Sequence, residues 1–231
     1  MSDIKKQKIF VDKVIDNIPA DKNEQKPIEL YKELVHHRFF EVISNANPIF
    51  YSLIKKKRLK KIITKFIQSG AKTDFIWKLP SEFRTFVKKN KELFPNMDYI
   101  DDLLWFEWIE IKLFMKDYSS FKRSKFDSSY LYDISKSAKI KRLSYKVYEQ
   151  EFKIKGEYCV LSYFDLKIKE VIYREISPFM YEFLKLISKF SIKNAILKIS
   201  RKYKLEPKEL KEILIQPLKE LCTLGVLVRK G

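Results

Sequence analysis

YCVLSYFDLKIKEVIYREISPFMYEFLKLI, residues 158–187, is the stretch that decides the fold of the second half of this chain. Residues 158–164 and 170–176 are rich in β-branched and aromatic side chains, which favour strands. The residues between them have the length of a hairpin loop. Ser177 followed by Pro178 forms an N-cap and a first helical residue, a position that tolerates proline because its N–H has no helical partner. The stretch therefore predicts a β-hairpin that leads directly into a helix over 179–189.

The segments on either side extend this into a small domain. Upstream, apolar and polar side chains alternate over 143–152, which predicts a first strand that Gly156 ends. Downstream, Ser191 is positioned to cap a second helix, and a third is expected over 207–224. Apolar residues at helical spacing form the expected inward face of the third helix: Leu210, Ile213, Leu214, Leu218 and Leu221. Residues 138–231 are thus predicted to form three strands followed by three helices, a winged-helix-like domain.

The first half is predicted as a succession of helices with short connections. Apolar residues recur there at helical spacing, as in Leu59, Ile62, Ile63 and Phe66, a run that Gly70 ends. Further helices are expected over 3–17, 27–44, 48–54, from 79 onward and over 99–117. A serine- and lysine-rich segment, 118–137, then reads as a linker. The predicted fold class is therefore α+β, with an all-helical domain over 1–117, this linker, and the small domain over 138–231.

The formal charge of +18 suggests a nucleic-acid partner, because a basic surface releases counterions from phosphates. Only eight of the 48 basic residues are arginine, however, although arginine is the side chain that reads phosphate and guanine bidentately. The positive charge is also spread evenly between the two halves, so no basic arm or tail stands out. Charge alone therefore does not decide the partner.

Several functional classes lack the sequence features that they require. The four glycines are too few for a glycine-rich phosphate loop. The adjacent His36 and His37 point about 100° apart on a helix and cannot chelate one metal well. No His or Cys has zinc-finger spacing, and no nucleophile with its base and acid can be assembled. We therefore expect no enzyme activity, no metal and no cofactor.

The chain is expected to be cytoplasmic. Its first residues are polar and are not followed by the apolar stretch and cleavage site of a secretory signal. Its longest apolar runs are far shorter than the roughly 20 residues that span a membrane. Cys159 and Cys222 are isolated in apolar surroundings and are predicted to be buried, reduced thiols.

Two charged residues interrupt apolar helical faces in the first half. Glu107 lies between Leu104 and Trp108. Arg38 shares a face with Val35 in an earlier helix. Because a buried charge without a partner is costly, we predict an ion pair between Arg38 and Glu107 that joins the two helices. A catalytic acid or a metal ligand is the alternative role for Glu107.

The first half contains YKELVHHRFFEVISNANPIFYSLI (31–54), FIWKLPSEFRTFVK (75–88) and YIDDLLWFEWIEIKLFMKD (99–117). Together these segments resemble the HvfC-like family, whose N-terminal region is often described as a DNA-binding domain. They follow the order of that family over most of residues 28–117. The pair His36-His37 and Asn47 depart from its pattern, which affects the expected surface rather than the fold. The resemblance implies a partner of multinuclear non-haem iron oxidative enzymes that delivers a precursor peptide to them.

The second half contains the opening stretch followed by AILKISRKYKLEPKELKEILIQPLKELCTLGVLV (195–228). The order of hairpin, short helix and two amphipathic helices is similar to the peptide-recognition fold of PqqD-like proteins, which modify ribosomally made peptides or accompany the enzymes that do. Both resemblances imply the same role. That role is a non-catalytic adaptor that binds a ribosomal precursor peptide and an iron-dependent peptide-modifying enzyme.

An exposed edge strand offers unpaired N–H and C=O groups that an extended peptide can complete. We expect residues 170–176 to be that edge, with the third helix as the other wall of the groove. The predicted peptide-binding residues are Glu170, Val171, Ile172, Tyr173, Arg174, Leu210, Ile213 and Leu214. The alternative is that the N-terminal domain covers this edge, since proteins usually cover long edges.

The second candidate function is a DNA-binding regulator that uses the three C-terminal helices. Basic residues recur over 185–204 without an acidic one, and the expected phosphate contacts are Lys193, Lys198, Arg201, Lys202 and Lys204. Two features disfavour this role. The predicted hairpin precedes all three helices, whereas a typical winged helix places its hairpin after the recognition helix. The third helix also begins with acidic as well as basic residues, where base contacts should start.

Overall fold

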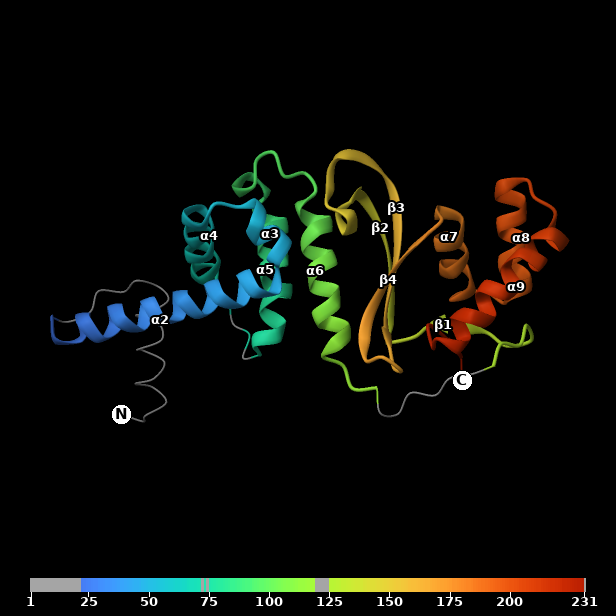
Figure 1. Ribbon diagram of the computed structural model, residues 1–231, viewed down its shortest axis with the longest axis horizontal. Coiled ribbons are helices and arrows are strands. Elements are labelled where there is room, and N and C mark those ends of the chain that lie inside the picture. Colours follow the sequence, from blue (N-terminus) through green and yellow to red (C-terminus); the bar gives the residue numbers. More distant parts are fainter. Residues whose placement is uncertain (1–21, 72, 74, 119–124, 231) are drawn as a thin grey trace. The chain divides into compact units, whose positions relative to one another are not determined.

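The computed structural model describes residues 22–71, 73, 75–118 and 125–230 of the chain. The protein divides into two compact units, Met1–Ile111 and Lys112–Gly231 (Figure 1). The N-terminal part is helical and the C-terminal part contains a small sheet, so the predicted α+β fold class is confirmed. The helix expected over 3–17 lies outside the described residues.

The N-terminal part packs around phenylalanine rings. Its helices are α2 (Lys22–Ala46), α3 (Pro48–Leu53), α4 (Lys56–Gln68), α5 (Leu79–Lys89) and α6 (Ile100–Phe114), with the short 3-10 helices η1 (Ile76–Lys78) and η2 (Lys91–Leu93). The buried Phe83 ring of α5 lies 5.8 Å from that of Phe50 on α3 and 5.3 Å from that of Phe66 on α4, measured between centroids. Leu59, Ile62, Ile63 and Phe66 are all buried, which confirms the inward face predicted for α4.

Pro27 lies inside α2 rather than at its first residue, so the start expected at 27 is wrong. A proline near the beginning of a helix removes one hydrogen bond to the preceding turn, and that turn can still form. Pro48, in contrast, does open α3, and Pro80 lies at the beginning of α5. Helix α4 is followed by Gly70, whose positive φ of 84° suits a residue without a side chain.

The sheet of the C-terminal part has three antiparallel strands in the order β2-β3-β4. Their bounds are Ala138–Lys146, Glu151–Asp165 and Glu170–Ile176. The first strand was expected over 143–152, but β2 begins earlier and ends at Lys146. A 3-10 turn, η3 (Val147–Glu149), follows it, and Gln150 adopts a left-handed conformation with φ 58°. The turn escaped prediction because it contains no glycine or proline and the apolar alternation continues through it.

Gly156 does not end a strand, as the sequence led us to expect, but lies within β3. A Cβ atom at this position would lie 2.9 Å from Cζ of the Tyr158 ring, closer than atoms can pack. The glycine therefore gives room for a tyrosine that folds back along its own strand.

The hairpin predicted from the opening stretch is confirmed. Strands β3 and β4 pair antiparallel with Asp165 opposite Glu170. Within the loop, the N–H of Lys169 donates to the carbonyl of Asp165 at 2.8 Å, and the N–H of Lys167 donates to Oδ1 of the same aspartate at 2.7 Å. The aspartate thus closes the turn with both its backbone and its side chain.

Three helices follow the sheet: α7 (Pro178–Ile187), α8 (Ile192–Tyr203) and α9 (Pro207–Thr223). Both predicted caps are confirmed. The Ser177 hydroxyl accepts the N–H of Met180 at 3.1 Å, and the Ser191 hydroxyl accepts the N–H of Asn194 at 3.3 Å. Each serine satisfies one N–H that the first turn of its helix leaves unpaired.

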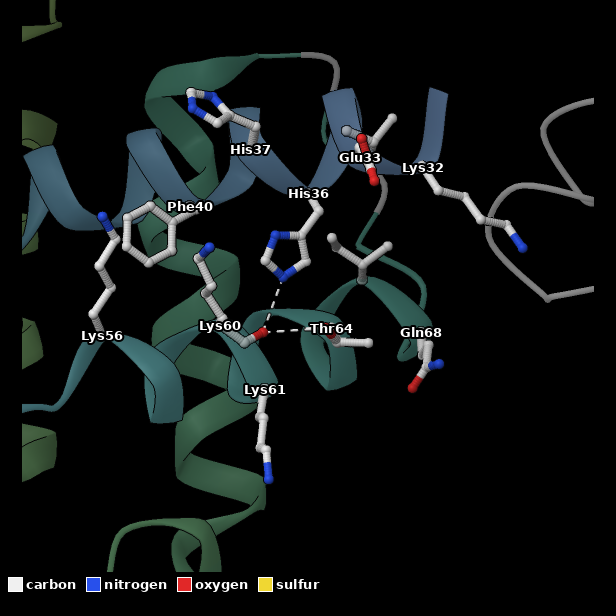
Figure 2. Close-up of a pocket in the computed structure, with 12 residues that line it drawn as sticks. Lys32, Glu33, His36, His37, Phe40, Lys56, Lys60, Lys61, Thr64 and Gln68 are labelled. Carbon is white, nitrogen blue, oxygen red and sulfur yellow. Dashed lines mark hydrogen bonds between the residues drawn. The ribbon is translucent and has the colours of Figure 1, made fainter. Parts of the chain in front are cut away.

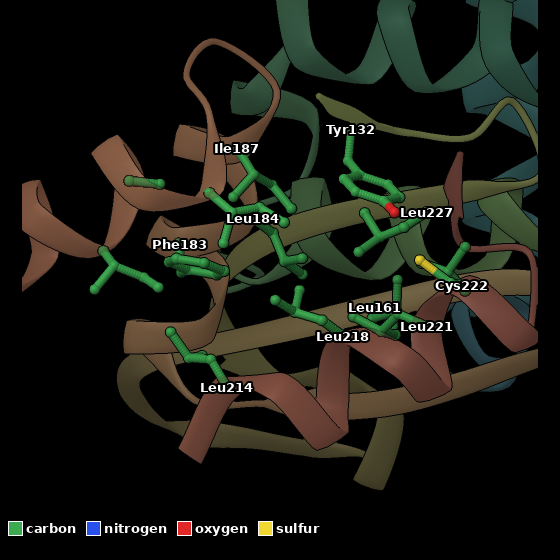
Figure 3. Close-up of a cluster of buried hydrophobic side chains, with 14 of the residues drawn as sticks. Tyr132, Leu161, Phe183, Leu184, Ile187, Leu214, Leu218, Leu221, Cys222 and Leu227 are labelled. Carbon is green, nitrogen blue, oxygen red and sulfur yellow. The ribbon is translucent and has the colours of Figure 1, made fainter. Parts of the chain in front are cut away.

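A second, two-stranded sheet joins the two ends of the C-terminal part. Strand β1 (Tyr132–Ile134), in the segment expected to be a linker, pairs antiparallel with β5 (Leu227–Arg229). Tyr132 is 1% exposed and enters the hydrophobic core. Figure 3 shows this core, to which β3 contributes Leu161, α7 contributes Phe183 and Leu184, and α9 contributes Leu214, Leu218 and Leu221. The core fixes the three helices on one face of the β2-β3-β4 sheet.

Candidate functional site

Strand β4 is an edge strand. The sheet order is β2-β3-β4, so β3 is its one partner strand among the residues that the structure describes. Over the same described ranges, no further strand pairs with β4 on its outer side. This edge position is the arrangement that strand addition requires.

The two faces of β4 differ in what they contact. On one face, Ile172 and Ile176 pack against the hydrophobic core, where Ile172 lies opposite Tyr163 of β3. On the other face, Val171 lies opposite Phe164, whose ring stacks on that of Tyr118 at 4.9 Å. Both faces are thus anchored by packing, and the strand can present its outer edge without losing its place in the sheet.

Helix α9 is tied to β4 by a charged pair. The Arg174 guanidinium donates to Oε1 of Glu220 at 2.5 Å, and it also lies 5.7 Å above the centre of the Tyr163 ring. Both charged side chains are about half exposed, at 43% and 51%. Glu220 was not predicted as a site residue, because nothing in the sequence relates two residues that far apart in the chain.

The predicted groove wall on α9 is only partly correct. Leu210 and Leu214 are 2% and 1% exposed and belong to the hydrophobic core, so neither side chain is open to a peptide. Ile213 is 66% exposed, and its predicted inward position is wrong. Of the residues predicted on α9, Ile213 is therefore the one that an incoming chain could touch.

The basic residues predicted to contact nucleic acid fall into two groups. Lys193, Lys198, Arg201 and Lys204 are exposed on α8 or at its C-terminal end. Lys202 instead donates to Glu182 of α7 at 2.6 Å. Its charge is therefore balanced within the protein, which weakens the expected phosphate-binding surface.

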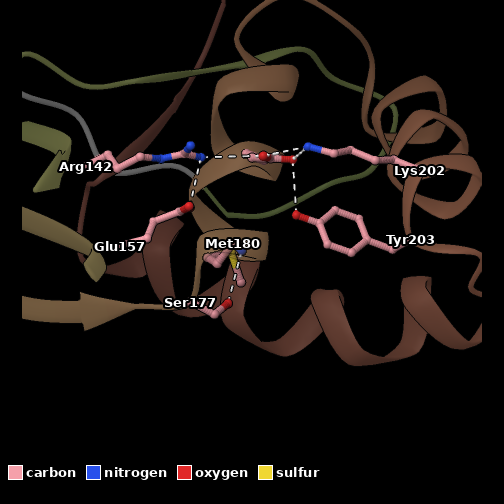
Figure 4. Close-up of polar contacts among 7 residues, drawn as sticks. Arg142, Glu157, Ser177, Met180, Lys202 and Tyr203 are labelled. Carbon is pink, nitrogen blue, oxygen red and sulfur yellow. Dashed lines mark hydrogen bonds and ion pairs between the residues drawn. The ribbon is translucent and has the colours of Figure 1, made fainter. Parts of the chain in front are cut away.

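Lys202 belongs to a network of charges that surrounds Glu182 (Figure 4). The Tyr203 hydroxyl donates to the same carboxylate at 3.2 Å, and the Arg142 guanidinium of β2 lies 3.5 Å from it and 3.3 Å from Glu157 of β3. The hydrogen bond from Lys202 holds the pKa of Glu182 below its ordinary value. The network links α8 to α7 and to the sheet, which is a structural role.

The predicted ion pair between Arg38 and Glu107 does not form. Oε1 of Glu107 accepts the backbone N–H of Ile49 at 2.6 Å, and its two oxygens lie 3.4 Å from the N–H of Phe50. These N–H groups belong to the first turn of α3, where backbone N–H groups have no acceptor within the helix. They serve as partners of the Glu107 carboxylate in place of the cation that we had predicted. Burial raises the pKa of Glu107 to about 7 despite these bonds. Arg38 lines a separate hollow with Val35 and Ile76.

A groove of about 690 Å³ lies between α2 and α4 (Figure 2). Both histidines line it, but they have separate contacts. His36 Nε2 lies 2.9 Å from the carbonyl oxygen of Lys60, and His37 Nδ1 lies 3.5 Å from Oε2 of Glu41. In the described parts of the chain, no three His, Cys, Asp or Glu residues gather as a metal site would require. This groove was not predicted from the sequence.

Comparison with known proteins adds no relative: no family model matches the chain, and no curated protein matches it. Of the helices in the described ranges, not one combines the length and the apolar composition needed to cross a membrane.

Proposed function

We propose that this protein is a non-catalytic adaptor that binds an extended polypeptide along the outer edge of β4. The observation that carries the proposal is the position of β4 at the end of the β2-β3-β4 sheet, where no further strand of the described chain pairs with its outer side. An incoming chain in extended conformation would complete the ladder as a fourth strand.

The edge is suited to a specific rather than a general interaction. Backbone hydrogen bonds supply affinity that is independent of sequence, while alternate side chains of β4 and exposed residues of α9 select the ligand. Arg174 and Glu220 hold α9 beside the strand through their ion pair. Ile213 adds an apolar contact on the same helix.

The polypeptide that the adaptor binds is proposed to be a ribosomal precursor peptide, and its partner a multinuclear iron-dependent peptide-modifying enzyme in the cytoplasm. Both parts of this proposal rest on the resemblances of residues 31–117 and 158–228 to HvfC-like and PqqD-like proteins. In such a pair the iron enzyme supplies the chemistry. The adaptor brings the substrate to it, which raises the local concentration of the peptide.

Proline substitution tests the edge directly, because neighbouring residues of a strand direct their N–H groups to opposite sides. Of the two variants Val171→Pro and Ile172→Pro, one therefore loses a hydrogen bond to β3, and the other keeps the ladder with β3 and loses only an N–H on the outer side. We expect that variant to keep the native circular dichroism spectrum and to lose binding of a synthetic extended peptide rich in β-branched residues. Val171→Thr and Ile172→Thr, which keep the N–H, are the matched controls. Unchanged binding by a folded proline variant at the outer position would refute the edge.

The partnership is tested by co-purification. The tagged full chain, expressed in its native host, is expected to bring down an iron-containing enzyme, and the folded proline variant is expected to retain that enzyme while losing the peptide. Failure to recover such an enzyme under native expression would count against the adaptor role, even if the edge binds peptide.

DNA binding by α8 remains the second candidate, because Lys193, Lys198, Arg201 and Lys204 are exposed on one helix and its end. Binding of a defined duplex that falls steeply with added salt, and that is lost in a Lys193→Glu, Lys198→Glu variant, would support it. The pairing of Lys202 with Glu182 argues against it, since one of the five cations is already balanced.

A further inference from the structure

The groove between α2 and α4 combines an apolar floor with a basic rim. Val35 and Phe40 of α2 and Ile67 of α4 are half-buried and contribute apolar surface. Lys56 and Lys60 extend from α4 toward α2 (Figure 2). At about 690 Å³ the groove lies within the volume range of ligand-binding clefts. It is therefore shaped for a ligand that is apolar on one side and charged on the other.

The charge along this groove is mostly positive, with four lining lysines, two of them Lys56 and Lys60, against one lining carboxylate, Glu33 of α2. Helix α4, KKRLKKIITKFIQ, carries six basic residues and no acidic one. Within the described ranges neither Lys56 nor Lys60 has a carboxylate within 4 Å, whereas Lys91, Lys146 and Lys202 each pair with an acid. Unbalanced cations that border apolar surface attract carboxylates and raise the rate at which an acidic partner associates.

The chemistry of the rim favours an acidic polypeptide over a nucleic acid. The one arginine of α4, Arg58, donates to the carbonyl of Leu93 at 2.7 Å and is not among the residues that line the groove, so the described lining offers no guanidinium to clamp a phosphate. The Phe40 ring is half-buried, with the Tyr51 ring against it at 5.9 Å and the Lys56 ammonium over it, so it is a poor platform for a stacked base although it still contributes apolar surface. Lysine point charges above an apolar floor suit glutamate and aspartate side chains on an amphipathic segment.

We propose that the groove between α2 and α4 is a docking site for an acidic amphipathic polypeptide segment, with apolar side chains on Val35, Phe40 and Ile67 and carboxylates on Lys56 and Lys60. This site lies on a different unit from β4 and does not depend on the adaptor role proposed above. It gives the protein a second binding surface with its own chemistry, so that two polypeptides can be held at once.

The probe is a synthetic acidic amphipathic helix with leucines on one face and glutamates on the other, labelled with a fluorophore. Binding to the full chain is measured by fluorescence anisotropy at low salt. Lys56→Glu, Lys60→Glu is expected to weaken binding about tenfold or more, because two attractions become repulsions. Lys57→Glu, Lys65→Glu changes the same charge on the same helix outside the groove and is expected to weaken binding less than about twofold.

Four results would overturn the proposal. The first is that the probe does not bind the wild-type chain, and the second is that the two double variants lose affinity equally. The third is that a probe whose leucines are replaced by serine binds with equal affinity. The fourth is that a DNA strand of matched charge binds more tightly and that its binding also depends on Lys56 and Lys60. If the glutamate variant fails to fold by circular dichroism, Lys56→Gln, Lys60→Gln takes its place. Loss of probe binding with unchanged peptide binding at β4 separates this proposal from the adaptor role.

Discussion

Glu107 makes the stability of the N-terminal part depend on pH in a way that a single substitution can isolate. The residue is 6% exposed, and its carboxyl accepts the N–H groups of Ile49 and Phe50 at the beginning of α3. Burial raises its pKa from an ordinary 4.5 to about 7. The folded state therefore binds this proton more tightly than the unfolded chain, and the free energy of unfolding falls as the pH rises from the unfolded to the folded pKa.

The size of the effect follows from the two pKa values. At about 1.36 kcal/mol for each pH unit between 4.5 and about 7, the whole cost of ionising Glu107 in the fold is about 3 kcal/mol. About 2.5 kcal/mol of this is lost between about pH 5 and pH 8, after which the contribution is constant. Other groups titrate in the same range, so the prediction concerns the difference between wild type and Glu107→Gln. That difference is expected to change by about 2.5 kcal/mol over the range.

Tryptophan fluorescence is the appropriate signal, because Trp77, Trp105 and Trp108 all lie in the first unit. Urea unfolding is followed at several pH values for wild type, Glu107→Gln and Glu92→Gln, the last at an exposed carboxylate. The wild-type and Glu92→Gln curves are expected to run parallel, while Glu107→Gln loses the steep fall toward pH 8. Parallel curves for all three proteins would show that the Glu107 carboxyl is not held at a raised pKa, and the reasoning about α3 would be wrong.

Three further predictions concern the C-terminal part. Leu214→Ala should lower the free energy of unfolding by about 2–5 kcal/mol in urea titrations followed by circular dichroism, whereas the neighbouring Ile213→Ala should change it by less than about 0.5 kcal/mol. Similar losses in the two variants would contradict the burial of Leu214 and the exposure of Ile213. Ser177→Ala should cost about 1 kcal/mol in the same titration by removing the cap of α7, and Ser177→Asp should restore most of it; no loss in the alanine variant would rule out the cap. Burial raises the pKa of Cys222 to about 11, so at neutral pH the Cys222 thiol should react with a thiol reagent only after urea is added. Rapid labelling of Cys222 in the folded protein would disagree with its buried position.

Local signals in the sequence predicted the elements that are defined by their own residues. The hairpin at 165–169, the serine caps of α7 and α8 and the apolar stripe of α4 each depend on side chains a few residues apart. Such patterns are readable because the hydrogen bonds and the buried face belong to one element.

The features that sequence reasoning missed depend on distant residues. The pairing of β1 with β5 joins residues 132–134 to 227–229, and Tyr132 becomes a core residue through that pairing. Glu107 was correctly expected to have a partner, but backbone N–H groups at a helix end serve that purpose as well as Arg38 would have done. Ile213 shares the spacing of the inward residues of α9 but lies at the margin of the stripe, where a small rotation of the helix exposes it.

The candidate site was predicted in part. The sequence placed the edge at residues 170–176, and the structure has a strand over those residues at the end of the sheet. The charged tie between Arg174 and Glu220 and the basic groove between α2 and α4 could not be predicted, because each is made by side chains from separate elements. Such sites exist only once the elements have packed.

Hydrogen–deuterium exchange of the backbone amides, measured for the full chain with and without the synthetic extended peptide, tests the central claim most directly. We predict that added peptide slows exchange in residues 170–176, while residues 138–146, at the opposite edge of the same sheet, exchange as before. Slowed exchange at β2 or α8 with none at β4 would contradict the account.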